Sequence, residues 1–467
     1  MSVTSRTPDR PEPAAPRVTG SSGRPVRPLL AALIVAAGVV AVQALAPVVL
    51  AVVVPIAVGA GLLVAALRLT GEGHDAETRS WLGRVTLSAA VAHLGIAVVI
   101  ASSASLISTF GGDATTYHEG ARALVDHWVL GRPFPDFIGA GKEGFFYGLA
   151  GIYWLFGPHP IAGLALNAAF AGVLVPLVAD TSRRLFGPAA IRPAALMVAL
   201  LPGFLLWTSQ LLREAPMLAC LALIANVSVR LTERTRPGLL VVLSLALATL
   251  FTLRANVALL VAAGVLAGLA LGSRRGLAGV AAGGASLGLV VAIVLAAGIG
   301  AAGFRLATSS DLDDVNLARQ DLATSAESGF AEDQDVSTGG SAAAFLPVAL
   351  VNFALGPFPW QVANARQLGG LIEAMSHWVL LPSLWRGWRA SGALIGRVRL
   401  VLVLPATLVA CSLAVLIGNY GTITRQRLQV TVFLVPFAAL GWSLRPRAAT
   451  SASAPGPTVP RPEAAAQ

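Results

Sequence analysis

The stretch Gly111–Glu119 holds the residue of this chain best placed to do chemistry, Asp113. It follows a long apolar run and opens the first sizeable polar segment between such runs. An acidic side chain at the mouth of a membrane helix is costly and seldom without function. A carboxylate in that position can serve as a general base or as a metal ligand. We therefore predict that Asp113 is the chemical centre of a membrane-embedded enzyme.

Other ionisable side chains are expected at the same membrane face. Arg213 and Glu214 open one apolar run, Arg254 lies between two runs, and Arg425 and Arg427 precede the last run. Arginine offers a planar fork that suits phosphate oxygens, and lysine, here Lys142, offers a point charge. Together with Asp113 and Glu214 these residues indicate a site that binds an anionic head group and deprotonates a hydroxyl. A divalent metal ion could also bind to these carboxylates, but two carboxylates alone are a weak indication of a metal site.

Each of these residues also has a purely structural interpretation. Asp113 could cap a helix that starts near Thr115, and Glu214 could complement a helix dipole. Arg425 and Arg427 could anchor a helix at the membrane interface. Glu373 and His377, four residues apart in one apolar run, fit a satisfied core pair better than a catalytic one. The aromatic residues of the first loop fit a membrane belt better than a sugar platform: Phe145, Phe146, Tyr147, Tyr153 and Trp154.

Composition places the chain among all-α, polytopic membrane proteins. Of its 467 residues 55% are hydrophobic and 12% charged, and several apolar runs reach about 20 residues, enough for a helix to cross a bilayer. The net charge of +10 comes almost wholly from arginines between the runs, which set orientation and do not indicate nucleic-acid binding. Cys220 and Cys411 lie inside apolar runs and indicate neither a disulfide nor a metal site. No zinc spacing or nucleotide-binding fingerprint occurs.

The order of apolar runs predicts about twelve transmembrane helices within residues 29–445. Residues 1–28 are rich in Pro, Arg, Ser and Thr, and residues 446–467 are rich in Pro, Ala and Ser. Both segments are predicted to be disordered tails. Interfacial or re-entrant segments are predicted at 145–156 and 343–360, within outer loops at 109–159 and 304–365. The predicted spans are two within 29–69, then 85–108, 160–180, 191–209, 212–229, 238–253, 255–272, 277–303, 366–384, 400–418 and 428–444.

The arginines between the predicted spans fix an orientation. With both termini in the cytoplasm, the inner segments collect most of the arginine pairs and clusters, as the positive-inside rule requires. The loop that carries Asp113 and the acidic loop at 304–342 then lie outside. We therefore expect a multi-pass protein of the inner or plasma membrane with its ionisable cluster on the outer face.

The chain resembles the membrane glycosyltransferases of the GT-C class that use polyprenyl-phosphate sugars. The nearest branch is the dolichyl-phosphate-mannose protein mannosyltransferase-like group, which includes bacterial lipid A aminoarabinose transferases. The resemblance covers about 105–235 and rests on four motifs in order: Gly112-Asp113-Ala114-Thr115-Thr116-Tyr117, Leu155-Phe156-Gly157, Arg184-Leu185-Phe186-Gly187 and Glu214-Ala215-Pro216. Glu214 stands where the family more often has Asp, and Lys142-Glu143-Gly144 where it often has Lys-Pro-Pro or His-Pro-Pro.

The resemblance implies inverting transfer of a sugar from a polyprenyl-phosphate carrier to a glycan, lipid or protein acceptor. Asp113 would be the base, with Glu214 as the second acid of the outer site. Lys142, Arg213, Arg425 and Arg427 would hold the donor phosphate, and Tyr117 and Arg254 the rest of the substrate. Two alternatives stay open: a cell-surface polysaccharide polymerase or ligase that relies on the outer arginines, and a flippase or transporter of lipid-linked sugars.

Overall fold

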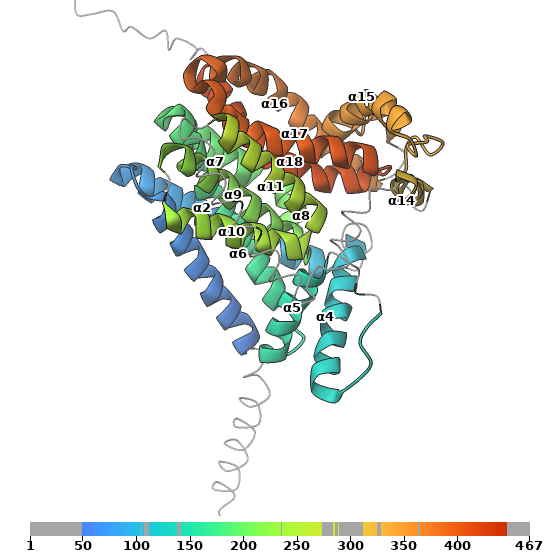
Figure 1. The fold of residues 1–467 in the computed structure, drawn as a ribbon. Coiled ribbons are helices and arrows are strands. Elements are labelled where there is room, and N and C mark those ends of the chain that lie inside the picture. The colour runs from blue at the N-terminus through green and yellow to red at the C-terminus, as the bar shows by residue number, and fades with distance from the viewer. Residues whose placement is uncertain are drawn as a thin grey trace, which may run out of the picture. The chain divides into compact units, whose positions relative to one another are not determined.

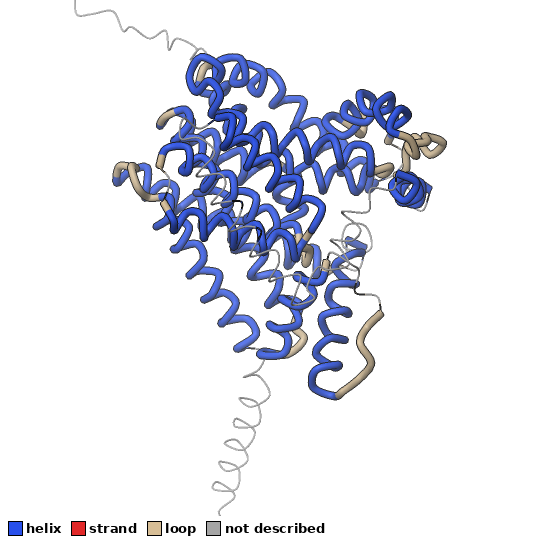
Figure 2. The backbone as a smooth tube through the Cα atoms, in the orientation of Figure 1, coloured by secondary structure: helices blue, strands red, loops and turns tan. Residues whose placement is uncertain are grey.

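The computed structural model describes residues 49–103, 105–106, 112–136, 138, 142–234, 236–272, 284, 288, 312–324, 328–362 and 365–445. The chain divides into two compact units, Met1–Val49 and Leu50–Gln467, and the second holds the helix bundle. The described part of this unit contains helices and loops without a strand (Figures 1 and 2). The helices of the bundle are α2 (Ala76–Ala101), α6 (Pro160–Phe186), α7 (Ile191–Leu200), α8 (Pro202–Thr208), α9 (Glu214–Glu233), α10 (Pro237–Leu253), α11 (Ala255–Gly272), α16 (Ala365–Ile395), α17 (Leu400–Leu416) and α18 (Tyr420–Ser443).

Six described helices are long and apolar enough to cross a membrane, and a bent pair, α7 with α8 at 50°, makes a possible seventh. The predicted count of about twelve is not confirmed. The helix α18 is not among the six, because its first turns carry polar residues such as Gln426 and Arg427. Both tails, the first part of 29–69 and, apart from residues 284 and 288, the predicted span at 277–303 lie outside the described residues. The six are Val49–Thr70, Ala76–Ala101, Pro160–Phe186, Glu214–Glu233, Ala255–Gly272 and Gln367–Leu416.

Helices of the bundle meet at glycines, where their backbones approach closely. A Cβ added at Gly268 of α11 would lie 2.6 Å from the Cα of Val401 in α17. A Cβ at Gly441 of α18 would overlap the carbonyl oxygen of Ser383 in α16. Small residues at such crossings are how membrane helices gain packing contacts without a hydrophobic driving force. These two crossings join α11 to α17 and α16 to α18.

Two short helices lie within residues 109–159, which the sequence predicted to be the first outer loop. They are α4 (Gly112–Leu130) and α5 (Glu143–Phe156), and they pack side by side (Figure 1). Tyr117 of α4 meets Phe145 edge-on and lies tilted against Phe146, with both ring centroids 4.9 Å away. At 14 residues α5 is shorter than a membrane span, so its length fits the predicted interfacial helix.

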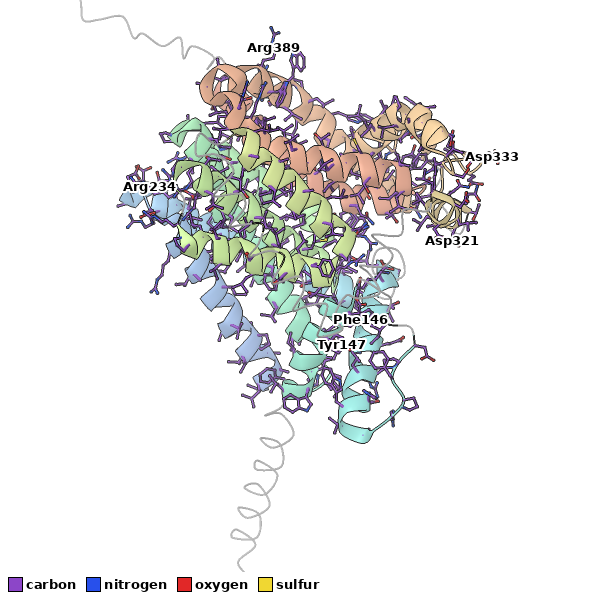
Figure 3. All side chains as sticks on the ribbon, in the orientation of Figure 1. Phe146, Tyr147, Arg234, Asp321, Asp333 and Arg389 are labelled. Carbon is purple, nitrogen blue, oxygen red and sulfur yellow. The ribbon has the colours of Figure 1, made fainter. Side chains whose placement is uncertain are left out.

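A lobe formed by α14 (Leu312–Thr324) and residues 328–336 is attached to the start of α18. Its centre is Arg319, which is buried between the rings of Phe330 and Phe345. The Phe330 ring stacks on Tyr420 at 4.6 Å, and Ser328 hydrogen-bonds to Asn419, which caps α18. The acidic residues Asp321 and Asp333 lie on the exposed side of this lobe (Figure 3). The predicted segment 343–360 becomes α15 (Gly339–Leu355), a cis Gly356–Pro357 bond and the short turn η2 (Pro359–Gln361).

A buried ion network closes the bundle at the far end of α9. Asp180 of α6 is fully buried and pairs with Arg183, Arg184 and Arg230 at 2.7–2.9 Å. Asn226 donates a further hydrogen bond to the same carboxylate. A buried carboxylate is tolerated only when its charge and lone pairs are matched in this way. Because Glu214 and Arg230 are sixteen residues apart on α9, about 24 Å separates this network from the start of that helix.

Candidate active site

Arg425 joins two acidic residues that are far apart in the sequence. Its Nη1 lies 2.5 Å from Oδ2 of Asp113, and its Nε lies 3.1 Å from Oε1 of Glu214. Asp113 and Glu214 come from the first turns of α4 and α9, and Arg425 comes from the second turn of α18. The structure thus brings together Asp113, Glu214 and Arg425, hereafter the Asp113–Arg425–Glu214 cluster, as the sequence predicted for the rim of the bundle.

The two carboxylates of this cluster have different surroundings. The Asp113 side chain is 58% exposed, whereas that of Glu214 is 1% exposed. Both lie at the start of a helix, where the helix dipole favours negative charge. In the described part of the chain neither oxygen of Glu214 has a hydrogen-bond donor, so the Arg425 charge is its main compensation. Asp113 is therefore the carboxylate that a substrate can reach, and Glu214 lies behind the guanidinium.

Electrostatics keep Asp113 ionised. Partial desolvation acts to raise the pKa of its carboxyl, but the charge and the hydrogen bond of Arg425 outweigh it, and the net shift is downward. The charges of Lys142 and Arg213 lower the pKa of Asp113 further. Nearby opposite charges stabilise the ionised form of an acid. Asp113 is consequently a carboxylate at neutral pH, ready to accept a proton once its cationic partner moves away.

The cationic side chains predicted for an anionic group surround the same cluster. Arg213 donates from Nη1 to the carbonyl oxygen of Leu253 at 2.9 Å. Lys142 stands just before α5, and its pKa is lowered by partial desolvation and then by the charge of Arg213. Arg254, in the turn between α10 and α11, donates from Nη2 to Oε1 of Gln426 at 2.6 Å. This concentration of positive charge would attract a phosphate.

Tyr117 forms the apolar wall of the cluster. It lies one helical turn after Asp113 on α4 and is 6% exposed against Phe145 and Phe146. Burial raises the pKa of its phenol, so the hydroxyl stays protonated and can donate a hydrogen bond. The charges of Arg213 and Glu214 act on this hydroxyl, which places it close to the cluster. Tyr117 can therefore bind substrate as a donor but cannot act as a base at neutral pH.

Arg427 faces away from this cluster. Residues two apart on a helix are separated by about 200° around its axis, so Arg425 and Arg427 point to different sides of α18. Arg427 pairs with Glu373 of α16 at 3.2 Å and also donates to the carbonyl oxygen of Gly356. The sequence grouped both arginines with the donor phosphate, but the structure brings only Arg425 to Asp113.

A comparison with protein families adds to this geometry. The model of the dolichyl-phosphate-mannose-protein mannosyltransferase family (PMT_2) matches residues 144–299.

This segment matches the mannosyltransferase family.

The resemblance seen in the sequence is thereby confirmed at the level of the family. The matched segment runs from α5 through α11 and includes Arg213, Glu214 and Arg254, whereas Asp113 and Arg425 lie outside it. No curated protein matches the chain.

Three residues that lie beside Arg254 or Arg427 were not expected to do so. Gln426 accepts the hydrogen bond of Arg254, and Glu373 and His377 pair at 3.2 Å beside Arg427. The four-residue spacing of Glu373 and His377 had indicated that they share a face, but their basic partner comes from α18, more than fifty residues later. Nothing local in the sequence identifies a partner at that distance.

The donor set of the cluster does not resemble a metal site. Among the residues that the structure describes, no three His, Cys, Asp or Glu side chains come together. Asp113 and Glu214 share the Arg425 guanidinium as their ion-pair partner. The arrangement is suited to binding an anion through Arg425 and to receiving a proton on Asp113.

Proposed function

We propose that the chain is an inverting glycosyltransferase that moves a sugar from a polyprenyl-phosphate carrier to a hydroxyl of a cell-envelope acceptor. The family match implies a membrane glycosyltransferase of the GT-C type with a lipid-linked sugar donor. The multiple apolar helices indicate a multi-pass membrane protein. The Asp113–Arg425–Glu214 cluster is the observation that supports the more specific assignment.

Asp113 is the proposed general base. In the described structure Arg425 Nη1 lies 2.5 Å from its carboxylate and lowers its pKa, which also lowers its strength as a base. An arriving phosphate would compete for the same guanidinium, and charge-assisted Arg–phosphate bonds are strong. When Arg425 turns to the phosphate, its positive charge no longer offsets the desolvation of Asp113, and the pKa of Asp113 rises. Donor binding thus prepares the base.

The proposed reaction balances in one displacement. The acceptor oxygen attacks the anomeric carbon from the side opposite the phosphate, while the bond from that carbon to the phosphate oxygen breaks. Asp113 takes the proton of the acceptor hydroxyl, and the polyprenyl phosphate leaves with the bonding electrons. Lys142, Arg213 and Arg425 stabilise the charge that develops on the leaving oxygen.

The cluster is proposed to face the outside of the cell. At the other end of the bundle Asp180 pairs with three arginines, Arg183, Arg184 and Arg230. Arg234 lies at the end of α9 (Figure 3). The positive-inside rule favours that arginine-rich end in the cytoplasm. Both termini would then be cytoplasmic, and the protein would lie in the inner or plasma membrane.

The test is transfer by membranes that carry Asp113→Asn, with a radiolabelled polyprenyl-phosphate sugar as the donor. The variant keeps the shape of the side chain but removes the base, and loss of general-base help costs about 10²- to 10⁴-fold in rate. Asp126→Asn is the matched control, because Asp126 lies on the same helix and pairs with the exposed Arg132 at 2.8 Å. Transfer by Asp113→Asn at the rate of the control would refute the proposal.

The polymerase or ligase alternative depends on Arg425 and Arg427 acting together. Arg427 is instead paired with Glu373 and bound to Gly356, on the side of α18 away from Asp113. Activity that survives Asp113→Asn but is lost in both Arg425→Ala and Arg427→Ala would favour that alternative.

A further inference from the structure

An apolar cavity lies among α15, α16, α17 and α18, away from the Asp113–Arg425–Glu214 cluster. Its volume is about 250 Å³, and its walls are mainly leucine, valine, alanine and phenylalanine side chains. A second cavity of about 310 Å³ continues from it and shares Leu381, Leu384 and Leu434. The second cavity reaches Trp388 and Phe437. Together they form one elongated apolar space of the kind that a hydrocarbon chain fills.

One end of this space is polar. The first cavity is lined by His377, Arg427 and Thr431 in addition to its apolar walls. The Arg427 side chain is 3% exposed, and its Nε has no hydrogen-bond partner in the described part of the chain. A buried donor without a partner costs free energy, so an acceptor oxygen supplied by a ligand would be stabilised there.

The space is accessible from the side of the bundle that a bilayer would cover. Leu381, which lines both cavities, is 42% exposed, and Trp385, which lines the second, is 61% exposed. Both belong to α16, part of a candidate membrane span, where exposed apolar side chains face lipid. A chain from the surrounding bilayer can therefore enter beside α16, where Leu381 and Trp385 are exposed, without crossing water.

The charge of the polar end indicates which head group fits. Arg427 is already balanced by Glu373 at 3.2 Å, and Glu373 is itself buried and pairs with His377. An anionic head group would meet the Glu373 carboxylate at low dielectric, where repulsion is strong. A hydroxyl or ester oxygen would accept a hydrogen bond from Arg427 without adding charge.

We propose that this space binds a membrane lipid distinct from the sugar donor, with one hydrocarbon chain in the cavities and an uncharged hydroxyl or ester head group at Arg427. The donor phosphate is assigned to the other side of α18, where Arg425 meets Asp113. The lipid site does not depend on the proposed transfer reaction, because it is defined by a different face of the helix.

Photolabelling of the full-length protein in nanodiscs tests the proposal. The probes are a diacylglycerol and a phosphatidic acid that carry the same diazirine-labelled acyl chain. We expect the diacylglycerol to crosslink to residues of α16 and α18 that line the cavities, about tenfold more efficiently than the phosphatidic acid. Peptide mass spectrometry identifies the crosslinked residues. Labelling that favours phosphatidic acid, or that lies outside the cavities, would overturn the assignment.

Two cavity-filling variants and a competitor complete the test. Ala410→Leu and Ala438→Leu each place a larger side chain in the first cavity and should abolish the label. Leu245→Phe is the matched control, because it enlarges a side chain on an exposed face of α10 outside the cavities. Thermal melting identifies variants that fold, and either folded variant suffices. Displacement of the diacylglycerol by polyprenyl phosphate would assign the space to the donor's own chain and so refute a separate lipid.

Discussion

Arg425 Nη1 lies 2.5 Å from Asp113 Oδ2, although 312 positions separate the two residues in the chain. The contact joins the first turn of α4 to the second turn of α18 and leaves Glu214 of α9 on the other side of the same guanidinium. One side chain thus connects three helices at the candidate active site, so the loss of its charge should affect both carboxylates at once.

Replacing Arg425 should reduce transfer more than any other single cation. In Arg425→Ala the carboxylates of Asp113 and Glu214 lose their shared counter-ion, and the donor phosphate loses a ligand. Loss of a donor that stabilises developing charge costs about 10²- to 10³-fold in kcat. Arg425→Lys keeps the charge but not the fork and should recover part of the rate. Initial rates at saturating donor measure both variants, and equal activity of Arg425→Ala and wild type would contradict the role.

The acid limb of the rate profile should move when Arg425 is neutralised. Asp113 must be ionised to accept a proton, and Arg425 holds its pKa below the usual value of 3.8. In the wild type Asp113 should therefore stay more than half ionised as the pH falls to that value, and kcat/KM should lose less than half of its plateau value through this group. In Arg425→Gln the main downward influence is gone, desolvation acts to raise the pKa, and the limb should shift to higher pH. Values of kcat/KM measured across pH and normalised to each plateau reveal the shift. An acid limb at the same pH in both proteins would show that Asp113 is not the group that titrates there.

The buried network at the far end of α9 should matter for stability and not for chemistry. Asp180→Ala leaves Arg183, Arg184 and Arg230 without their buried partner, and breaking such a network costs about 3–5 kcal/mol. The yield of folded protein and its melting temperature should fall, while activity per folded molecule stays close to wild type. Glu77→Ala removes an exposed pair with Arg192 and should cost about 0–1 kcal/mol. Equal decreases in melting temperature in the two variants would show that the buried Asp180 network stabilises the fold no more than an exposed ion pair does.

The crossing of α16 and α18 should not tolerate a single added methyl group. A Cβ at Gly441 overlaps the Ser383 carbonyl oxygen, which is backbone and cannot turn aside. Gly441→Ala should therefore lower the stability by about 1–3 kcal/mol. Gly95→Ala is the control, because nothing lies within 4 Å of a Cβ at that position of α2. Thermal melting in detergent gives the comparison, and equal melting temperatures would indicate that the helices can separate without cost.

The proposed orientation predicts which positions a membrane-impermeant reagent reaches in intact cells. Cysteines are introduced at Asp136, which lies between α4 and α5 in the segment that also carries Asp113, and at Arg234, which follows α9, whose last turns hold Arg230 of the Asp180 network. With Cys220 and Cys411 replaced by alanine, only the cysteine at 136 should react with an impermeant maleimide before the cells are opened. Labelling at 234 instead would reverse the orientation, and the candidate active site would face the cytoplasm.

Some of the site could be predicted because its residues mark the ends of apolar runs. Glu214 begins α9 and Arg254 lies between α10 and α11, as the sequence indicated. A charge at the end of a membrane helix is visible locally, since the surrounding hydropathy sets it off. The identity of the partner is not visible in this way, because the pairs of Asp113 with Arg425 and of Glu373 with Arg427 depend on how distant helices pack.

Other predictions were limited for geometric reasons. Hydropathy indicated that Arg425 and Arg427 share a location, but it does not record direction around a helix axis, and the two side chains diverge. Span counting by apolar length also fails where a helix is bent, as between α7 and α8, or carries polar residues into the bundle, as α18 does. The family match covers Glu214, whereas Asp113 and Arg425 lie outside the matched segment.

The spacing of Arg425 and Arg427 on α18 restricts how this protein can change over time. An insertion or deletion of one residue between Asn419 and Arg425 would rotate both guanidinium groups by about 100° around the helix, because Asn419 is fixed by its bond to Ser328. Arg425 would then miss Asp113, and Arg427 would miss Glu373, in a single step. Substitutions elsewhere on α18 can be gradual, but the length of this segment should be invariant among functional descendants of the chain.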